Sequence, residues 1–269
     1  MDAAPGQVST TDGAGPWYRS VAHEREVFRA AAGARLPVLL KGPTGCGKTR
    51  FVEAMAHELG RELVTVVCNE ETSAVDLLGR HLVVGGDTVW QDGPAVRAVR
   101  TGAMLYLDEL VDARADVLTV VHPLADHRRE LFVDRLREVV RAAPGFQLVA
   151  SCNPGYSMAG KELKPSLRHR FVTVSFDWPD AAVEAEIVAA EGGVEPKVAK
   201  RLVGFAAKVR ALPELALPET VSTRLLVSAA QLIAGGLPPR LACRCAIVEP
   251  LADDSDVIGA LGDAVDLAF

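Results

Sequence analysis

Eight residues near the start of the chain constrain its fold more than any other feature. They match the pattern G-x-x-x-x-G-K-[ST] in full and are Gly42, Pro43, Thr44, Gly45, Cys46, Gly47, Lys48 and Thr49. The run before them, residues 36–40, is short and apolar, as a buried strand is. After them Phe51, Met55 and Leu59 recur at helical spacing, and Gly60 can end that helix. A glycine-rich loop between a strand and a helix is the setting in which this pattern binds phosphate.

The chemistry of such a loop follows from its glycines and from the helix behind it. Backbone N–H groups can surround phosphate oxygens because glycine has no Cβ to block the approach. The helix N-terminus adds the positive end of its dipole. We expect Lys48 to reach the β- and γ-phosphates and Thr49 to supply a hydroxyl to Mg²⁺. The motif therefore predicts binding of ATP with Mg²⁺; an incidental glycine-rich turn is the disfavoured alternative.

Strand-like runs and helical patterns alternate along the first two thirds of the chain. The further runs are residues 63–68, 103–107, 146–152 and 172–176. Apolar strands separated by helices predict a parallel sheet covered on both faces. Residues 81–91 form two alternating runs around a Gly-Gly-Asp turn, which predicts a β-hairpin, and residues 130–134 resemble one arm of a second hairpin.

The pattern changes after Pro179, where helical stripes take over. We expect three segments: a disordered tail over 1–16, an α/β nucleotide-binding domain over 17–178 and an all-helical lid domain over 179–269. The tail is rich in Ala, Gly, Thr and Pro and has neither the basic start nor the apolar stretch of a signal peptide.

Two acids follow the apolar run 104–107 at its carboxyl end. Side chains at the carboxyl ends of parallel strands face the ligand crevice. We expect Asp108 to hold the Mg²⁺ shell and Glu109 to polarise the attacking water. Asn153 ends the next strand, where its amide either orients that water or simply begins an Asn-Pro-Gly turn. The residues alone leave these two interpretations of Asn153 equal.

Three arginines are candidates for contacts with the nucleotide. Arg168 and Arg170 precede the last strand and could reach the γ-phosphate of a neighbouring subunit, although a surface charge cluster is the favoured interpretation from the residues alone. Arg224 follows Thr223 at a helix start in the second domain and could close that domain over the nucleotide. A solvated arginine is the alternative there.

Composition excludes several other classes of protein. The net charge of −6 argues against a non-specific nucleic-acid binder. Five cysteines at spacings that fit no zinc or disulfide framework indicate reduced thiols. His122 and His127 lack a second ligand pair, so a metal site there is disfavoured. No apolar run reaches the length of a membrane span. We therefore expect a cytoplasmic protein without membrane insertion.

In order along the chain, these motifs resemble the AAA+ ATPases, and within them the MoxR group and its CbbQ/NirQ/NorQ branch. The glycine-rich loop and the Leu-Asp-Glu strand are shared very widely. The stretches HPLADHRREL at His122 and SCNPGYSM at Ser151 are much more specific to this branch. The likeness extends from about Trp17 to Phe269, nearly the whole chain.

The resemblance implies a fold, roles and partners. The fold is a P-loop AAA+ αβα sandwich with a five-stranded parallel sheet and insert hairpins, followed by the helical lid. Asn153 takes the sensor 1 role, Arg170 that of the arginine finger with Arg168 as a second, and Arg224 that of sensor 2. Segments 81–91 and 122–137 correspond to the two inserts. Relatives commonly have Lys-Lys-Gly-Glu in the second insert, whereas residues 134–137 here are Asp-Arg-Leu-Arg and lack the turn glycine.

The resemblance further implies a homo-hexameric ring that acts with a von Willebrand A-domain partner to remodel a client metabolic enzyme. Rubisco activation, by release of inhibitory sugar phosphates, is the first expectation, and nitric oxide reductase maturation is the alternative. A non-motor scaffold, in which ATP only stabilises the ring, is a third hypothesis, and the presence of Glu109 argues against it. Magnesium-chelatase-type, gas-vesicle-type and replication ATPases are disfavoured.

Overall fold

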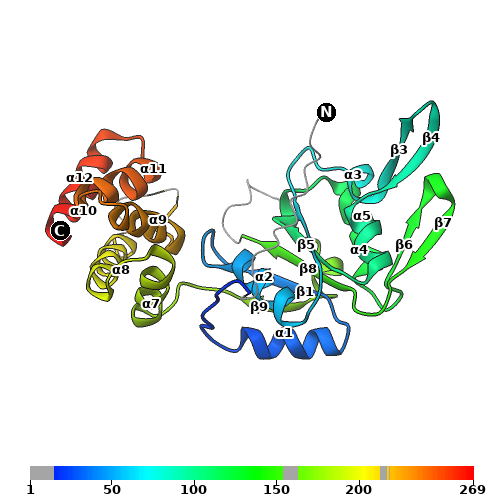
Figure 1. Cartoon of the computed structure of the whole chain (residues 1–269), viewed down its shortest axis with the longest axis horizontal. Helices are drawn as coiled ribbons and strands as arrows, with labels where there is room; N and C mark the ends of the chain where they lie inside the picture. Colours follow the sequence, from blue (N-terminus) through cyan, green and yellow to red (C-terminus); the bar gives the residue numbers. More distant parts are fainter. Residues whose placement is uncertain (1–14, 154–162, 213–216, 218) are drawn as a thin grey trace.

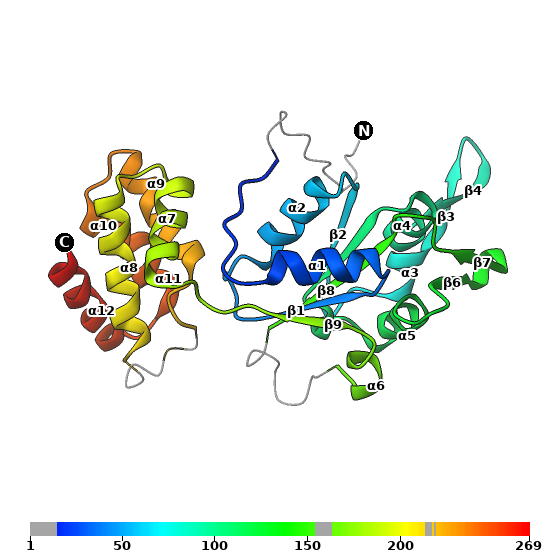
Figure 2. The same cartoon turned by 90° about the horizontal axis from the view of Figure 1, so that it is seen from below.

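The computed structural model describes residues 15–153, 163–212, 217 and 219–269. The expected tail over 1–16 lies almost entirely outside this range. The chain forms a sheet flanked by helices and, beside it, a separate group of helices that follows in the sequence (Figure 1). A single extended segment leads from the last strand of the sheet to the first of these helices, as the second view also shows (Figure 2).

The central sheet has five strands in the order β2-β5-β8-β1-β9, and all four pairings are parallel. The fold class predicted from the sequence is thereby confirmed. Because every strand points the same way, the carboxyl ends of β1, β5 and β8 meet at one edge. The strands are β1 (Val38–Lys41), β2 (Leu63–Val67), β5 (Met104–Asp108), β8 (Gln147–Cys152) and β9 (Val172–Ser175).

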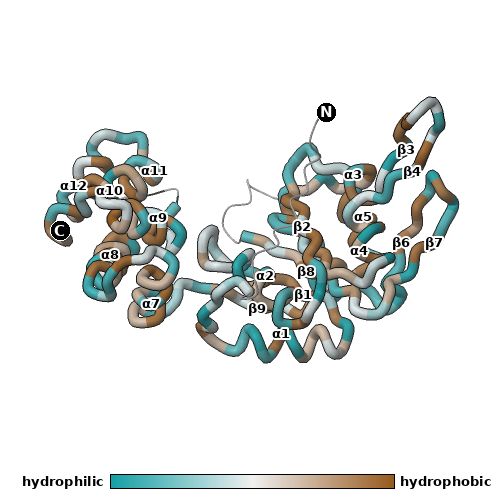
Figure 3. Tube along the Cα trace, viewed as in Figure 1, coloured by the Kyte–Doolittle hydropathy of each residue, from teal (hydrophilic) through white to brown (hydrophobic). Residues whose placement is uncertain are grey.

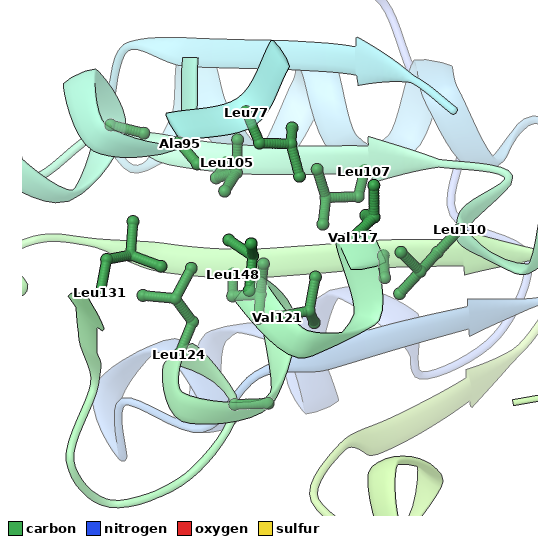
Figure 4. Packing of buried hydrophobic residues seen from close by; sticks show 14 of the residues in the cluster. Leu77, Ala95, Leu105, Leu107, Leu110, Val117, Val121, Leu124, Leu131 and Leu148 are labelled. Atoms are coloured by element: carbon green, nitrogen blue, oxygen red, sulfur yellow. The ribbon is translucent and has the colours of Figure 1, made fainter. Parts of the chain in front are cut away.

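Helices cover both faces of this sheet, and alternate strand residues point to opposite faces. Met104 and Tyr106 pack with Phe28 of α1 (Glu24–Gly33) and Phe51 of α2 (Lys48–Glu58). Leu105 and its alternate neighbours face the other side, which carries the other helices (Figure 4). Those helices are α3 (Ala74–Leu78), α4 (Pro94–Thr101) and α5 (Ala115–Leu124). The short helix α6 (Pro165–Arg168) precedes β9.

Two antiparallel hairpins project from the end of the sheet that lies away from the helical group (Figure 1). The first pairs β3 (Gly79–Val84) with β4 (Asp87–Asp92) through Gly85 and Gly86, whose φ angles are 63° and 96°. Both conformations favour glycine, so this tight turn follows directly from the sequence. Hydrophobic residues occur along the arms of this hairpin (Figure 3), and Val83 is 76% exposed.

The second hairpin pairs β6 (Glu130–Val133) with β7 (Glu138–Arg141). The 3₁₀ turn η2 (Asp134–Leu136) joins its arms, and Arg137 takes the left-handed conformation at φ 51° that a turn glycine would otherwise occupy. Helix α5 continues to Leu124 and contains Pro123 in its last turn. The first residues of the predicted insert 122–137 therefore belong to a helix. Pro123 has no N–H to donate to the preceding turn, so the helix lacks one backbone hydrogen bond there.

The second group consists of helices packed around their own apolar cluster, which includes Val188, Leu202, Phe205 and Leu226. Ser222 caps the start of the third helix, since its Oγ accepts a hydrogen bond from Leu225 N at 3.3 Å. The elements are α7 (Ala181–Gly192), α8 (Pro196–Arg210), α9 (Thr223–Ala234), α10 (Pro239–Cys243), the π-helical turn η4 (Arg244–Val248), α11 (Glu249–Leu251) and α12 (Ser255–Ala268).

The predicted boundary between residues 178 and 179 falls in the segment that joins β9 to α7. The division into two domains at this point stays a prediction. Among the helices of the described residues, none combines the length and the apolar character that crossing a membrane requires.

Candidate functional site

The glycine-rich loop connects the carboxyl end of β1 to the first residue of α2, Lys48. Gly45 and Gly47 have φ angles of 76° and 95°, in the left-handed region that residues with a Cβ rarely adopt. Gly42 meets a different constraint, because a Cβ there would lie 2.6 Å from the carbonyl oxygen of Phe176. The loop therefore depends on glycine for its backbone conformation at two positions and for space at a third.

Lys48 is buried, with 7% of its surface exposed, and its ammonium group contacts three oxygens. The Nζ atom donates to Gly42 O at 2.9 Å, to Pro43 O at 2.8 Å and to Asn153 Oδ1 at 2.7 Å. Burial lowers the pKa of Lys48 from its usual value. The charged end is thus held at the floor of the loop, beside the end of β8.

Asp108, the last residue of β5, accepts hydrogen bonds from three side chains. Its Oδ1 accepts from Tyr106 OH at 2.6 Å and from Ser151 Oγ at 2.5 Å, and its Oδ2 accepts from Thr49 Oγ1 at 3.3 Å. Burial raises the pKa of Tyr106, so this hydroxyl stays a donor to the carboxylate. The carboxylate is therefore oriented from both sides, and its second oxygen faces the first turn of α2.

Glu109 adopts a left-handed conformation at φ 56° and ψ 44°, which is unusual for a residue with a side chain. Its backbone N–H donates to Ser151 Oγ at 2.8 Å. Its Oε1 accepts from Asn153 Nδ2 at 3.0 Å. Because Asn153 also accepts from Lys48, one amide bridges the lysine of the loop and the acid at the end of β5.

A cavity of about 500 Å³ opens above these residues. Its volume lies in the usual range for small-molecule and cofactor sites. The floor is residues 44–50 of the loop with Asp108, Glu109 and Asn153. Further lining comes from Trp17, Tyr18, Arg19 and Val21 before α1, from Ile187 and Glu191 of α7, and from Thr223, Arg224, Val227, Ser228 and Gln231 of α9.

The start of α9 lies directly against the glycine-rich loop. A Cβ at Gly45 would lie 2.7 Å from Ser222 Cβ and 3.4 Å from Arg224 Cβ. An ion pair also connects α2 with α7, since Arg50 Nε lies 3.3 Å from Glu191 Oε1. The cavity is thus enclosed by the loop on one side and by α7 and α9 on the other.

The sequence-predicted residues do not all gather here. Residues 44–49 of the loop, Asp108, Glu109, Asn153 and the exposed Arg224 line the cavity, whereas Gly42 and Pro43 are absent from its described lining. Arg168 and Arg170 are exposed around the end of α6 and are absent from the described lining of the cavity. The guanidinium of Arg170 instead donates to Ser166 O.

Sequence reasoning missed two side chains that orient this site, Tyr106 and Ser151. Residues two apart on a strand share a face. Tyr106 therefore shares a face with Asp108, and Ser151 shares one with Asn153. That spacing was the available signal, although both residues look like ordinary core positions. Residues 17 and 18, whose aromatic side chains line the cavity, belong to no sequence motif that would have indicated this position.

Comparison with known proteins identifies relatives of the whole chain. Residues 37–171 match the family described as AAA domain (dynein-related subfamily), and residues 184–268 match the family described as CbbQ/NirQ/NorQ C-terminal. The chain is 52% identical to the denitrification regulatory protein NirQ of Pseudomonas aeruginosa, covering 94% of this chain and 97% of that protein. It is 54% identical to protein NorQ of Paracoccus denitrificans, covering 94% of each. It is 51% identical to protein CbbQ of Hydrogenophilus thermoluteolus, covering 94% of this chain and 95% of that protein.

Among solved structures, a mutant form of RuvB from Thermotoga maritima is similar in fold, with a TM-score of 0.55. The similarity covers 92% of this chain and 71% of that one at 15% sequence identity. At this level of identity the likeness concerns the fold alone.

Proposed function

Because the chain belongs to the CbbQ/NirQ/NorQ family of AAA ATPases, we propose that it hydrolyses ATP in the cavity and uses the hydrolysis to remodel a client enzyme. The observation that carries this proposal is the connected set at the cavity floor. There Lys48, Asn153 and Glu109 form one hydrogen-bonded chain, next to Thr49 and Asp108.

The groups at the floor suit a magnesium nucleotide. Gly45 and Gly47 have no side chains that would keep a phosphate from the backbone N–H groups of the loop. Lys48 brings a positive charge to the same loop. The Thr49 hydroxyl and the Asp108 carboxylate, 3.3 Å apart, are hard oxygen donors of the kind that Mg²⁺ prefers. These two residues would hold the ion, which neutralises charge that develops on the phosphates when it is bound.

The remaining residues divide the work of hydrolysis. Glu109 would accept the proton of the attacking water, a role in which a positioned carboxylate contributes about 10² to 10⁴ in rate. Asn153 donates to Glu109 Oε1 at 3.0 Å, which supports a role in orienting both that acid and the water. Arg224 reaches the cavity from α9 and would close the helical part over the phosphates.

A direct test uses two variants of the floor. Lys48→Ala is expected to lose magnesium-dependent binding of a fluorescent ATP analogue, whereas Glu109→Gln is expected to bind the analogue and lose turnover. Lys200→Ala, on the exposed side of α8, is the matched control for loss of a lysine. If Glu109→Gln still turns over ATP at a normal rate, Glu109 is not the water-activating residue. If it loses turnover but keeps the biological activity, the nucleotide acts as an assembly ligand rather than as fuel.

We further propose that the chain assembles into a homo-hexameric ring and that Arg170, with Arg168 beside it, acts on the nucleotide of the neighbouring subunit. Their exposure around the end of α6, away from the cavity lining of their own chain, supports action in trans. An arginine finger of this kind contributes about 10³ or more to the rate.

A subunit-mixing assay tests the finger. Arg170→Ala and Glu109→Gln subunits should each be inactive alone, and a mixture should recover activity because some interfaces then combine an intact finger with an intact acid. Arg141→Ala, at an exposed position of β7, controls for loss of a surface arginine. A mixture with no more activity than its two components contradicts action in trans, and native mass spectrometry measures the ring size.

The client stays open between two enzymes. Relatives named NirQ, NorQ and CbbQ match this chain at 48–54% identity, so similarity favours neither client. We propose a client reached through a von Willebrand A-domain partner, either Rubisco or nitric oxide reductase. Sugar-phosphate-inhibited Rubisco is incubated with the chain, its partner and ATP, with the Glu109→Gln chain as control. ATP-dependent recovery of carboxylation assigns Rubisco, and its absence with cognate components points to the reductase.

A further inference from the structure

A buried ion pair in the helical group lies close to the cavity without lining its floor. Glu184 of α7 is 1% exposed, and it receives a two-pronged contact from Arg210 of α8. The guanidinium donates through Nη1 to Oε2 and through Nη2 to Oε1, each at 2.8 Å. Such parallel bonds fix the relative orientation of both side chains. Thr223, the first residue of α9, donates its hydroxyl to the same Oε1 at 2.6 Å.

The same guanidinium contacts two further segments. Its Nε donates to Val221 O at 2.8 Å, just before α9, and its Cζ lies over the Trp178 ring, 4.6 Å from the ring centroid. Trp178 belongs to the segment that joins β9 to α7. One arginine therefore connects α7, α8, the start of α9 and the segment that leads from the sheet.

Thr223 stands between two residues that meet the nucleotide site. The preceding residue, Ser222, packs against the glycine-rich loop: a Cβ added at Gly45 would lie 2.7 Å from the Cβ of Ser222. The following residue, Arg224, lines the cavity. The hydroxyl bond from Thr223 to Glu184 thus fixes the part of α9 that contacts the glycine-rich loop and carries the cavity arginine.

Stability alone is a weak reason for this arrangement. Removing charges from water carries a large desolvation cost, and well-packed apolar side chains often replace buried ion pairs with no loss of stability. An apolar replacement would nevertheless have no directional contact with the start of α9. The network therefore suits a role in positioning better than a role in adding stability.

We propose that Glu184, Arg210 and Thr223 are positioning residues, which hold the start of α9 against the glycine-rich loop so that Arg224 points into the nucleotide cavity. This proposal rests on the proposed ATPase function. It assigns the effect of all three residues to one downstream side chain, and this is the property that an experiment can isolate.

The test is a double-mutant cycle between Thr223→Val and Arg224→Ala. Valine keeps the size of threonine and removes only the hydroxyl, so the buried position stays filled. In the otherwise native chain, Thr223→Val should lower kcat/KM for ATP about tenfold, and Thr223→Ser should restore it to within about twofold of native. In the Arg224→Ala background, Thr223→Val should change kcat/KM by less than about twofold.

Multiplicative losses in the double variant would overturn the proposal, because the hydroxyl would then act independently of Arg224. Thr101→Val, which removes a hydroxyl bond at the end of α4, controls for a general effect of such a change. Glu184→Gln keeps the size of the side chain and gives a second cycle with Arg224→Ala; if Thr223→Val fails to fold, this cycle decides the question in the same way. The ATPase activity of the native chain is measured first. If the native chain has none, the proposed function is refuted, and the variants are not compared.

Discussion

Ser151 makes one hydrogen bond with each of the two acids at the carboxyl end of β5. It is completely buried on β8, where its Oγ donates to Asp108 Oδ1 at 2.5 Å and accepts from Glu109 N at 2.8 Å. Ser151→Ala removes both contacts and leaves the backbone of the strand intact. Asp108 keeps the donors Tyr106 and Thr49, whereas the N–H of Glu109 loses its acceptor, Ser151 Oγ.

The size of the effect follows from these two bonds. A hydrogen bond to a charged group contributes about 1.5–3 kcal/mol, and an unsatisfied N–H costs about 1–3 kcal/mol when buried. Glu109 is only half-buried, so water offsets part of the second cost. We expect Ser151→Ala to lower the free energy of unfolding by about 1–2 kcal/mol. We expect kcat to fall about ten- to hundredfold, since each factor of ten corresponds to about 1.4 kcal/mol.

The assay is steady-state ATPase turnover as a function of ATP and of Mg²⁺. The KM for ATP should stay within a few-fold of native, because the glycine-rich loop and Lys48 are untouched. The Mg²⁺ concentration for half-maximal rate should rise, because one bond that orients Asp108 is lost. Ser166→Ala, an exposed serine on α6, is the control. A variant that is less stable yet keeps kcat within about twofold of native would show that Ser151 acts on folding alone, and the reasoning would be refuted.

Two further predictions concern the packing and the thiols. Gly192→Ala should destabilise the helical group by about 1–2 kcal/mol in chemical denaturation, because its Cβ would lie 2.3 Å from that of Ala230. Gly204→Ala, with open space around it on α8, should stabilise the chain by about 0.4–1 kcal/mol; equal effects of the two changes would contradict the described contact of α7 with α9. Under native conditions near neutral pH, the exposed Cys245 should react first with a disulfide reagent, and Cys245→Ser should abolish the fast phase. Cys46 should react slowly because burial raises its pKa and its thiolate forms only as the pH rises further; an unchanged fast phase in Cys245→Ser would contradict this order.

The sheet was predictable because its strands are continuous apolar runs that need no tertiary context to be recognised. Every strand of the central sheet was predicted within one or two residues, and Gly85 with Gly86 identified the first hairpin. The second hairpin was harder, since Arg137 takes a left-handed conformation that sequence rules reserve for glycine or asparagine. Its turn is determined by the pairing of β6 with β7 rather than by local preference.

Helix α1 and the cavity-lining residues before it were not predicted, because their positions depend on contacts distant in sequence. Glu24 is buried and accepts hydrogen bonds from Val21 N, Ala22 N and Tyr18 OH. In the sequence this acid looks like one of many surface charges near a helix start. Only the fold reveals that it holds Tyr18 at the edge of the cavity.

The floor of the site was identifiable from motifs, whereas its internal connections were not. Residue spacing placed Lys48 and Glu109 near one another, but it gave no indication that Asn153 bridges them. The roles assigned to these residues, and to Arg170, stay predictions for the experiments above. A bridge between side chains from three separate elements depends on how strands and loop end in space, which local sequence does not encode.

The edge strand β9 has a mechanical consequence for the whole chain. Within the described part of the chain it pairs only with β1, in parallel, and the segment to α7 follows it directly. A pull on the helical group that is directed along the strand would load all the bonds between β9 and β1 at once, in shear, whereas a sideways pull would open them one after another. The force needed to separate β9 from β1 should therefore be higher for a pull along the strands than for a pull across them.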